Sequence, residues 1–187
     1  MSLALIFDLD GVLVDSHQMH QRALSEAAQW HGFEVDVSGD APTVEKLRRS
    51  GVPENEIPLI YDDKRHLYDK QVRDTVGPSR KLVEALSWGT GPFAVCSNSH
   101  RASVDLVLER LGILPLIDVV VSASEVGASK PNPEVYRETL RRLKVPCSGA
   151  VVFEDSDDGI AAAKGAGILN VVRCDFSNIL LEVLKWV

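Results

Sequence analysis

Cysteine is scarce in this sequence, and its spacing excludes two classes of small protein. The 187 residues contain three cysteines, Cys96, Cys147 and Cys174, which lie far apart and form no CxxC pair. An odd and sparse count suits neither a disulfide framework nor a zinc site, both of which need several closely spaced ligands or partners. We therefore expect a protein of a reducing compartment, the cytoplasm, in which Cys96 is a core residue within an apolar run.

Long apolar runs and an excess of positive charge are also lacking. No stretch approaches the roughly 20 apolar residues of a membrane helix, and the apolar start runs directly into Asp8 without a signal-peptide cleavage site. Lys and Arg number 20 against 27 Asp and Glu, a net charge of -7 at pH 7. This balance disfavours nucleic acid and anionic membranes as partners. A phosphate ester can still bind where a metal ion and a few cations outweigh the global charge.

Apolar strands alternate with helices from Gly77-Pro78 to the end of the chain. Hydrophobic residues make up 45% of the sequence, which is ample for a core. Strands separated by helices predict right-handed βαβ units, and therefore an α/β fold with a Rossmann-like parallel sheet and helices on both faces. The predicted strands span residues 3–7, 92–96, 118–122, 149–153 and 169–173. The predicted helices of this part span residues 79–88, 101–111, 132–143, 160–165 and 179–186.

The stretch after the first strand differs in character, because it is charged and helical and contains no predicted strand. Its expected helices span residues 16–31, 43–50 and 53 to about 74. We therefore expect two domains, an α/β core of residues 1–15 and 78–187 and a small helical cap of residues 16–77. An insertion at this point would hang over the carboxyl edge of the sheet as a lid.

The first strand ends in two carboxylates, Asp8 and Asp10, followed by Gly11. Open α/β sheets bind their ligands at the carboxyl ends of parallel strands. Two carboxylates that converge there repel each other unless a proton or a cation compensates. A hard cation with oxygen ligands, such as Mg²⁺, satisfies this requirement.

Three further loops follow strands of the same predicted sheet and should emerge at the same edge. They contain Ser97-Asn98-Ser99, Lys130, and Glu154-Asp155. Acids that hold Mg²⁺, a hydroxyl group and amides for phosphate oxygens, and a lysine are the groups that phosphoryl transfer requires. A carboxylate can attack phosphorus and form an aspartyl phosphate. The edge is therefore predicted to be a phosphoryl-transfer site.

Four segments, in order, resemble the motifs of the haloacid dehalogenase-like hydrolase superfamily: FDLDGVLVDS, CSNS, SKPNPEVY and EDSDDGIAAAKGAG. The chain is most similar to the phosphoglycolate phosphatase and β-phosphoglucomutase-like members, which carry a helical (C1) cap between the first two motifs. The resemblance implies that Asp8 is the nucleophile and Asp10 the general acid/base. The acid at the Asp10 position favours phosphoryl chemistry over cleavage of a carbon–halogen bond.

The resemblance also implies the remaining roles. Asp8 and Asp155 would bind Mg²⁺ through side-chain oxygens, and Asp10 through its backbone carbonyl. Glu154 would support the metal or Lys130. The phosphoryl group would be bound by Ser97, Asn98 and Lys130.

Four residues near these motifs have a structural interpretation beside a functional one. His20 either contacts the substrate, as in mutase-like relatives, or is an ordinary helix residue. Ser99 is expected to cap the helix that begins at Arg101. Asp158 is expected in the first turn of a helix, and Gly159 is expected to allow close packing.

We expect a phosphatase of a small phosphorylated metabolite, a sugar phosphate or a phosphoglycolate-like compound, that is a monomer or a small homo-oligomer. A phosphomutase of the β-phosphoglucomutase type would use the same core motifs. A non-catalytic binding protein on this scaffold is disfavoured, because none of the motif acids, Ser97 or Lys130 is replaced. A response-regulator receiver domain is disfavoured too, because its phosphorylated Asp follows a later strand.

Overall fold

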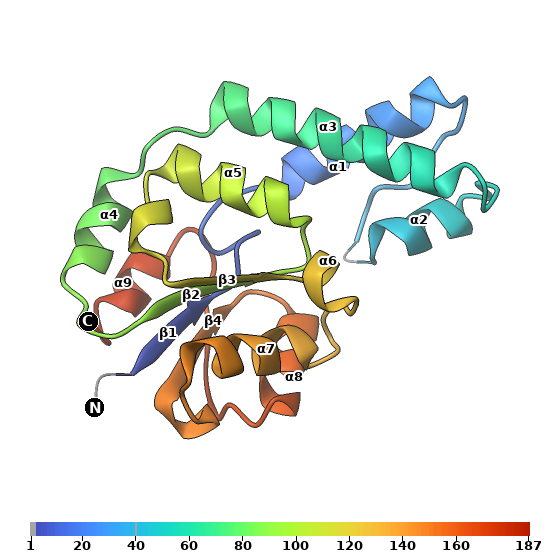
Figure 1. Cartoon of the computed structure of the whole chain (residues 1–187). Coiled ribbons are helices and arrows are strands. Elements are labelled where there is room, and N and C mark those ends of the chain that lie inside the picture. The colour runs from blue at the N-terminus through green and yellow to red at the C-terminus, as the bar shows by residue number, and fades with distance from the viewer. Residues whose placement is uncertain (1–2, 40) are drawn as a thin grey trace. The chain divides into compact units, whose positions relative to one another are not determined.

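A five-stranded parallel sheet forms the centre of the fold (Figure 1). The structure, a computed structural model, describes residues 3–39 and 41–187. The strand order is β3-β2-β1-β4-β5, so the first strand is the central one. This arrangement confirms the predicted α/β class with a parallel sheet. The strands are β1 (Ala4–Phe7), β2 (Phe93–Ser97), β3 (Val119–Ser122), β4 (Ala150–Glu154) and β5 (Asn170–Arg173).

The central strands are buried on both faces, as their continuous apolar sequences predict. Phe7 of β1 is in register with Val95 of β2 and with Phe153 of β4. The rings of Phe7 and Phe153 stack with their centroids 5.0 Å apart. Because these strands are parallel and in register, the residues that follow Phe7, Val95 and Phe153 meet at one edge of the sheet.

Helices cover both faces of the sheet (Figure 1). Helix α5 lies on one side of the sheet, and α7 and α8 lie on the other, where Tyr136, Leu140 and Ala162 join the core formed with Ile6 and Val152. Helix α6 was not predicted, because four residues are too few to show a helical period. The helices are α4 (Arg80–Ser87), α5 (Arg101–Leu111), α6 (Ala123–Val126), α7 (Glu134–Leu143), α8 (Asp157–Gly165) and α9 (Ile179–Val183), with 3₁₀ turns at Leu114–Leu116 and Cys147–Gly149.

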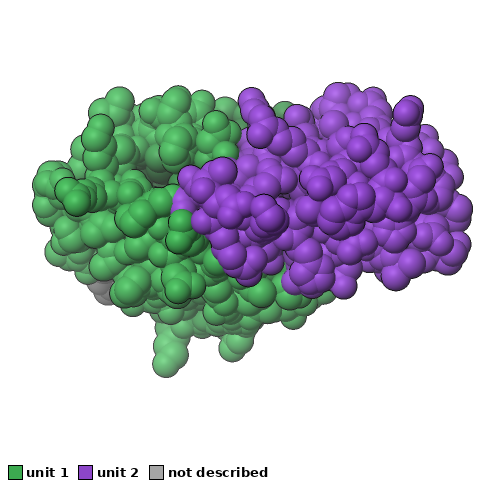
Figure 2. Space-filling view, turned by 90° about the horizontal axis from the view of Figure 1, so that it is seen from above, with its two compact units in different colours: residues 1–15, 77–187 green, residues 16–76 purple. Residues whose placement is uncertain are grey.

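The chain divides into two compact units (Figure 2). Unit 1 contains the sheet and consists of the described residues up to 15 and from 77 onward, and unit 2 spans residues 16–76. Unit 2 contains α1 (His17–Trp30), α2 (Thr43–Arg49) and α3 (Ile57–Thr75), with α1 packed against α3. Helix α3 begins four residues later than Pro53, and Pro58 lies in its first turn, where a missing N–H costs no helical hydrogen bond.

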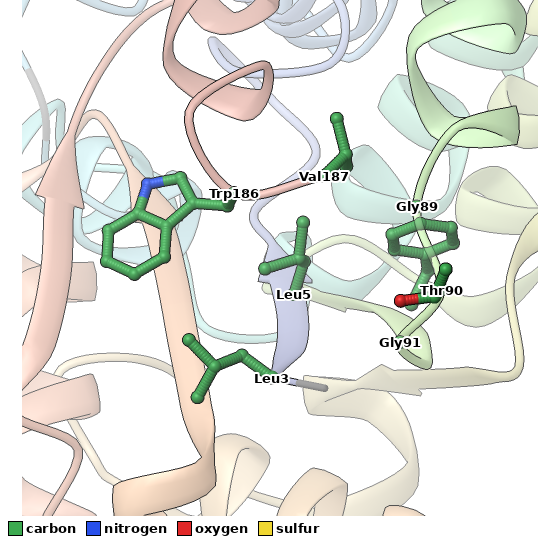
Figure 3. A pocket seen from close by; sticks show the side chains of 8 residues that line it. Leu3, Leu5, Gly89, Thr90, Gly91, Trp186 and Val187 are labelled. Atoms are coloured by element: carbon green, nitrogen blue, oxygen red, sulfur yellow. The ribbon is translucent and has the colours of Figure 1, made fainter. Parts of the chain in front are cut away.

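A pocket of about 240 Å³ lies at the amino ends of β1 and β2, near the end of the chain (Figure 3). Its lining includes the apolar side chains of Leu3, Leu5, Phe93 and Trp186. None of its lining residues has an acidic or basic side chain. It lies at the sheet edge opposite the motif residues, so it plays no part in the site described below. Among the described residues, no helix combines the length and apolar character needed to cross a membrane.

Candidate active site

The motif residues of unit 1 meet at the carboxyl edge of the sheet, as the βαβ pattern predicts. Asp8 follows β1, and Ser97 and Glu154 are the last residues of β2 and β4. Lys130 lies in the loop between α6 and α7. The burial of Asp8, Ser97, Lys130 and Glu154 is unusual for residues of these types, and their contacts explain how it is compensated.

Lys130 is a buried cation of this site, and the residue is only 5% exposed. Its Nζ donates hydrogen bonds to Asp8 Oδ1 at 2.6 Å, to Glu154 Oε1 at 2.6 Å and to the backbone carbonyl of Cys96 at 2.9 Å. An ammonium group has three N–H donors, so these three bonds use all of them. Lys130 therefore fixes the position of Asp8 relative to β2 and β4.

Glu154 is fully buried and accepts four hydrogen bonds. Oε1 accepts from Lys130 Nζ and from the Tyr136 hydroxyl at 2.7 Å. Oε2 accepts from the Ser156 hydroxyl at 3.1 Å and from the Ser156 N–H at 3.4 Å. A carboxylate offers about four lone-pair positions, so the hydrogen bonds of Glu154 saturate it. These contacts favour the predicted support of Lys130 by Glu154 over direct binding of a metal.

The charges of this cluster do not balance. Burial raises the pKa of Asp8 well above its usual value, and the charge of Lys130 opposes this while Glu154 and Asp10 add to it. Burial acts to raise the pKa of Glu154 too, but the charge and hydrogen bond of Lys130 hold it below its ordinary value. Burial would lower the pKa of Lys130, yet the charges of Asp8 and Glu154 raise it. Lys130 therefore stays protonated near neutral pH, and its single positive charge is shared between the carboxylates of Asp8 and Glu154.

A bound divalent cation would supply the positive charge that this cluster of carboxylates lacks. Carboxylate oxygens of Asp8 and Asp155 lie within 4.8 Å of each other, and an oxygen of the hydrogen-bonded Glu154 carboxylate completes the acidic cluster. Carboxylate oxygens are the ligands that hard divalent cations prefer. The residues present therefore suit a divalent metal, consistent with the predicted contribution of Asp8 and Asp155.

Asp10 is held by two serines from the end of β2. Its Oδ2 accepts hydrogen bonds from the Ser99 hydroxyl at 2.7 Å and from the Ser97 hydroxyl at 3.4 Å. The prediction that Ser99 caps α5 is wrong, because the cap residue is His100, whose Nδ1 accepts from the N–H of Ala102 at 3.3 Å. Ser99 contacts Asp10 instead, and its backbone N–H donates to Ser97 Oγ at 2.9 Å.

Asn98 contacts the main chain of Lys130. Its Oδ1 accepts from the Lys130 N–H at 2.8 Å, and its Nδ2 donates to the Lys130 carbonyl at 3.4 Å. Both polar atoms of the amide thus hold the lysine loop against the end of β2. A contact between Asn98 and a phosphoryl group stays a prediction.

Sequence reasoning assigned no role to Tyr136 or Ser156, which anchor Glu154. Tyr136 lies within SKPNPEVY, six residues after Lys130, but its helical position resembles that of an ordinary core residue. Lys130 Nζ also lies 5.2 Å from the centre of its ring. Gly159 is required by Glu154: a Cβ atom there would lie 1.9 to 2.1 Å from the atoms of that carboxyl group. This confirms close packing at Gly159 and identifies the group that packs there.

His20 lies in unit 2, on α1. Its Nδ1 is 3.1 Å from Lys64 Nζ, and its ring stacks on Tyr68 with the centroids 4.1 Å apart. These contacts join α1 to α3. They leave the predicted contact of His20 with a substrate as a prediction.

A family model described as haloacid dehalogenase-like hydrolase matches residues 3–167. Fructose-1-phosphate phosphatase YqaB of Escherichia coli is 30% identical over 174 residues, which cover 88% of this chain and 92% of the relative. A phosphorylated carbohydrates phosphatase of Thermotoga maritima is 30% identical over 185 residues, covering 88% of this chain and 82% of the relative. The crystal structure of CbbY from Rhodobacter sphaeroides in complex with phosphate gives a TM-score of 0.76 at 26% identity, covering 93% of this chain and 87% of that one.

Proposed function

Because this chain belongs to the haloacid dehalogenase-like hydrolases and is a phosphoric monoester hydrolase, we propose that it is a Mg²⁺-dependent phosphatase acting through an aspartyl phosphate on Asp8. The predicted family and enzyme class are confirmed by the family match and by the phosphatase relatives. The observation that carries the finer proposal is the 2.6 Å hydrogen bond that fixes Asp8 Oδ1 on Lys130 beside an acidic cluster.

Asp8 is the nucleophile in this proposal. Its carboxylate attacks phosphorus, and the bond from phosphorus to the leaving oxygen breaks with its electron pair on that oxygen. Asp10 donates a proton to the leaving oxygen and then accepts one from the water that attacks the aspartyl phosphate. Lys130 holds the attacking carboxylate in one orientation, which removes part of the entropic cost of the reaction.

Asp8 and Asp155 would hold the metal through side-chain oxygens, and Asp10 through its backbone carbonyl. When bound, Mg²⁺ supplies positive charge that screens the nucleophile and stabilises the phosphoryl oxygens. Glu154 keeps Lys130 in place from the buried side. Its four hydrogen bonds support this division of roles, since a saturated carboxylate has no lone pair to spare for a cation.

The phosphoryl oxygens would be bound by Ser97 and by backbone amides near the start of α5, with Asn98 beside them. Lys130 acts on the phosphoryl group chiefly through its charge, because its three donors are engaged by Asp8, Glu154 and Cys96. A direct hydrogen bond from Lys130 to phosphate would require the exchange of one of these partners.

We propose a sugar phosphate or a similarly small phosphorylated metabolite as the substrate. Relatives at 30% identity are a fructose-1-phosphate phosphatase and a phosphorylated carbohydrates phosphatase, which supports this class. The inserted helices of residues 16–77 would form the cap that selects the substrate. His20, with its partner Lys64, is the candidate for contact with the non-phosphate end of the substrate.

The proposal is tested by phosphate release from p-nitrophenyl phosphate and from fructose 1-phosphate, with Mg²⁺ and with EDTA. Release should require Mg²⁺ and should be lost in Asp8→Asn, because the amide is not a nucleophile for phosphorus. Asp158→Asn makes the same chemical change at an exposed position in the first turn of α8 and should retain activity. Turnover by Asp8→Asn, or turnover in EDTA, would contradict the proposal. Retention of a sugar bisphosphate, with little phosphate released, would instead identify a mutase.

A further inference from the structure

We infer that Ser99 is a positioning residue for catalysis, which holds the carboxyl group of Asp10 in the orientation that proton transfer requires. This inference rests on the proposed function, in which Asp10 is the general acid/base. From the sequence, Ser99 is expected only to cap the helix that begins at Arg101, so this is a new role for it. The geometry that carries it is the 2.7 Å hydrogen bond from the Ser99 hydroxyl to Asp10 Oδ2.

The hydrogen bonds around Asp10 have fixed directions. The backbone N–H of Ser99 donates to Ser97 Oγ at 2.9 Å, so this oxygen is an acceptor and its own hydrogen points elsewhere. That hydrogen is donated to Asp10 Oδ2 at 3.4 Å. Ser99 thus acts twice: its backbone orients the hydroxyl of Ser97, and its own hydroxyl binds Asp10 at the shorter distance.

The two serines are not equivalent once a phosphoryl group binds. A serine hydroxyl has one hydrogen and can donate it to one acceptor at a time. In the proposed complex, Ser97 donates its hydrogen to a phosphoryl oxygen and gives up its long bond to Asp10. The hydrogen bond from Ser99 persists in that complex, so Ser99 continues to orient Asp10 during the reaction.

The orientation of Asp10 affects the two chemical steps differently with an artificial substrate. Departure of p-nitrophenolate needs little help from an acid, because this leaving group is a stable anion. Hydrolysis of the aspartyl phosphate needs Asp10 as a base for water in every case. Loss of orientation should therefore slow the second step with p-nitrophenyl phosphate, and both steps with a sugar phosphate.

The experiment compares Ser99→Ala and Ser99→Thr with the wild type in steady-state and rapid-mixing assays. For Ser99→Ala with p-nitrophenyl phosphate, we expect kcat to fall roughly 10- to 100-fold, part of the effect that general acid–base groups contribute. KM should fall in parallel, so that kcat/KM changes little, and a burst of about one p-nitrophenolate per enzyme should appear as the aspartyl phosphate accumulates. Ser99→Thr keeps the hydroxyl group and should restore most of kcat.

Ser87→Ala is the matched control, because it removes the same kind of hydroxyl group from the exposed end of α4, outside the site. It should have wild-type kcat and no burst. Wild-type kinetics of Ser99→Ala would overturn the inference, and so would an equal fall of kcat and kcat/KM without a burst, which indicates general damage to the site. In both cases the activity of the wild type still supports the proposed function.

If the wild type proves inactive and the proposed function fails, crystal structures still test whether Ser99 orients Asp10. Crystals of the wild type and of Ser99→Ala are compared after soaking with Mg²⁺ and inorganic phosphate. The inference expects the Asp10 carboxyl group to bond Ser99 Oγ in the wild type and to rotate away in Ser99→Ala. An unchanged Asp10 side chain in Ser99→Ala would overturn the inference.

Discussion

Glu154 carries its charge at a fully buried position, and the residues around it explain how that is tolerated. Lys130 supplies the opposite charge, and Tyr136 and Ser156 supply the other hydrogen bonds. A buried ion pair contributes little net stability, but a buried charge left without its partners is costly, about 3–5 kcal/mol. The network is therefore better understood as a device that holds Lys130 and Asp8 in place.

Gly159→Ala should disrupt this network. The added Cβ would lie 1.9 Å from Glu154 Oε1, so either the carboxyl group or the start of α8 must move. Overpacking together with the disturbed buried charge should lower the free energy of unfolding by about 3 kcal/mol. Denaturant unfolding measures this loss, and phosphatase activity should fall with it, because Glu154 holds Lys130.

Gly77→Ala is the control for this substitution, since a Cβ there would have no atom within 4 Å. It should leave the unfolding free energy near the wild-type value. Equal stability of Gly159→Ala and Gly77→Ala would mean that Glu154 does not occupy the space beside Gly159.

At the scale of elements, His31 joins the end of α1 to the start of α3. Its Nε2 lies 2.8 Å from Asp63 Oδ2, and its Nδ1 lies 3.2 Å from Glu56 Oε2. The hydrogen bond to Asp63 raises the pKa of His31 above its ordinary value, and the hydrogen bond to Glu56 adds to this effect. Burial acts to lower the pKa, but the two carboxylates together outweigh it. The protonated imidazole therefore stabilises the packing of α1 on α3.

The stability of unit 2 should consequently depend on pH. A raised pKa in the folded state means that the stabilisation is complete below the unfolded-state value of about 6.5. It is lost as pH rises through the higher folded-state pKa. Urea unfolding of the wild type and of His31→Asn should differ more at pH 5.5 than at pH 8.5.

Asp63→Asn removes the negative charge that faces the protonated His31 ring and should reproduce most of the pH-dependent effect of His31→Asn. A difference between wild type and His31→Asn that stays constant from pH 5.5 to 8.5 would show that the ring acts by packing alone.

At the scale of the whole molecule, the charge deficit around Asp8 links metal binding to stability. An ion that binds the folded state alone adds about 2.7 kcal/mol at a concentration 100 times its Kd. For a chain of this length that corresponds to a rise of about 5–10 °C in the Tm of the unit that contains the site. Calorimetry with and without Mg²⁺ measures the shift.

Asp155→Asn tests whether the shift comes from the proposed site, because it replaces a charged carboxylate ligand by a neutral amide of nearly the same shape. The rise in Tm with Mg²⁺ should become much smaller in this variant, and EDTA should have little effect on it. An undiminished rise would place the responsible ion elsewhere.

The sequence alone determined the sheet, the inserted helical stretch and the position of the candidate site. Continuous apolar runs such as 149–153 predict buried strands, and alternation with helices predicts that those strands are parallel. Parallel strands place Asp8, Ser97, Lys130 and Glu154 at one edge whatever the details of packing. These conclusions depend on the local hydrophobic pattern and on the handedness of βαβ units, and both follow directly from the order of residues in the sequence.

Tertiary structure alone decided which side chain meets which. Ser99 and Asp10 are 89 positions apart, and Tyr136 and Glu154 come from different elements, so no periodicity connects them. Ser99 resembles a helix cap and Tyr136 a core residue, because each local pattern fits those roles equally well. The pairing of β1 with β2 brings Ser99 to Asp10, and the packing of α7 against the sheet brings Tyr136 to Glu154. A buried carboxylate such as Glu154 then accepts hydrogen bonds from the donors that packing places beside it.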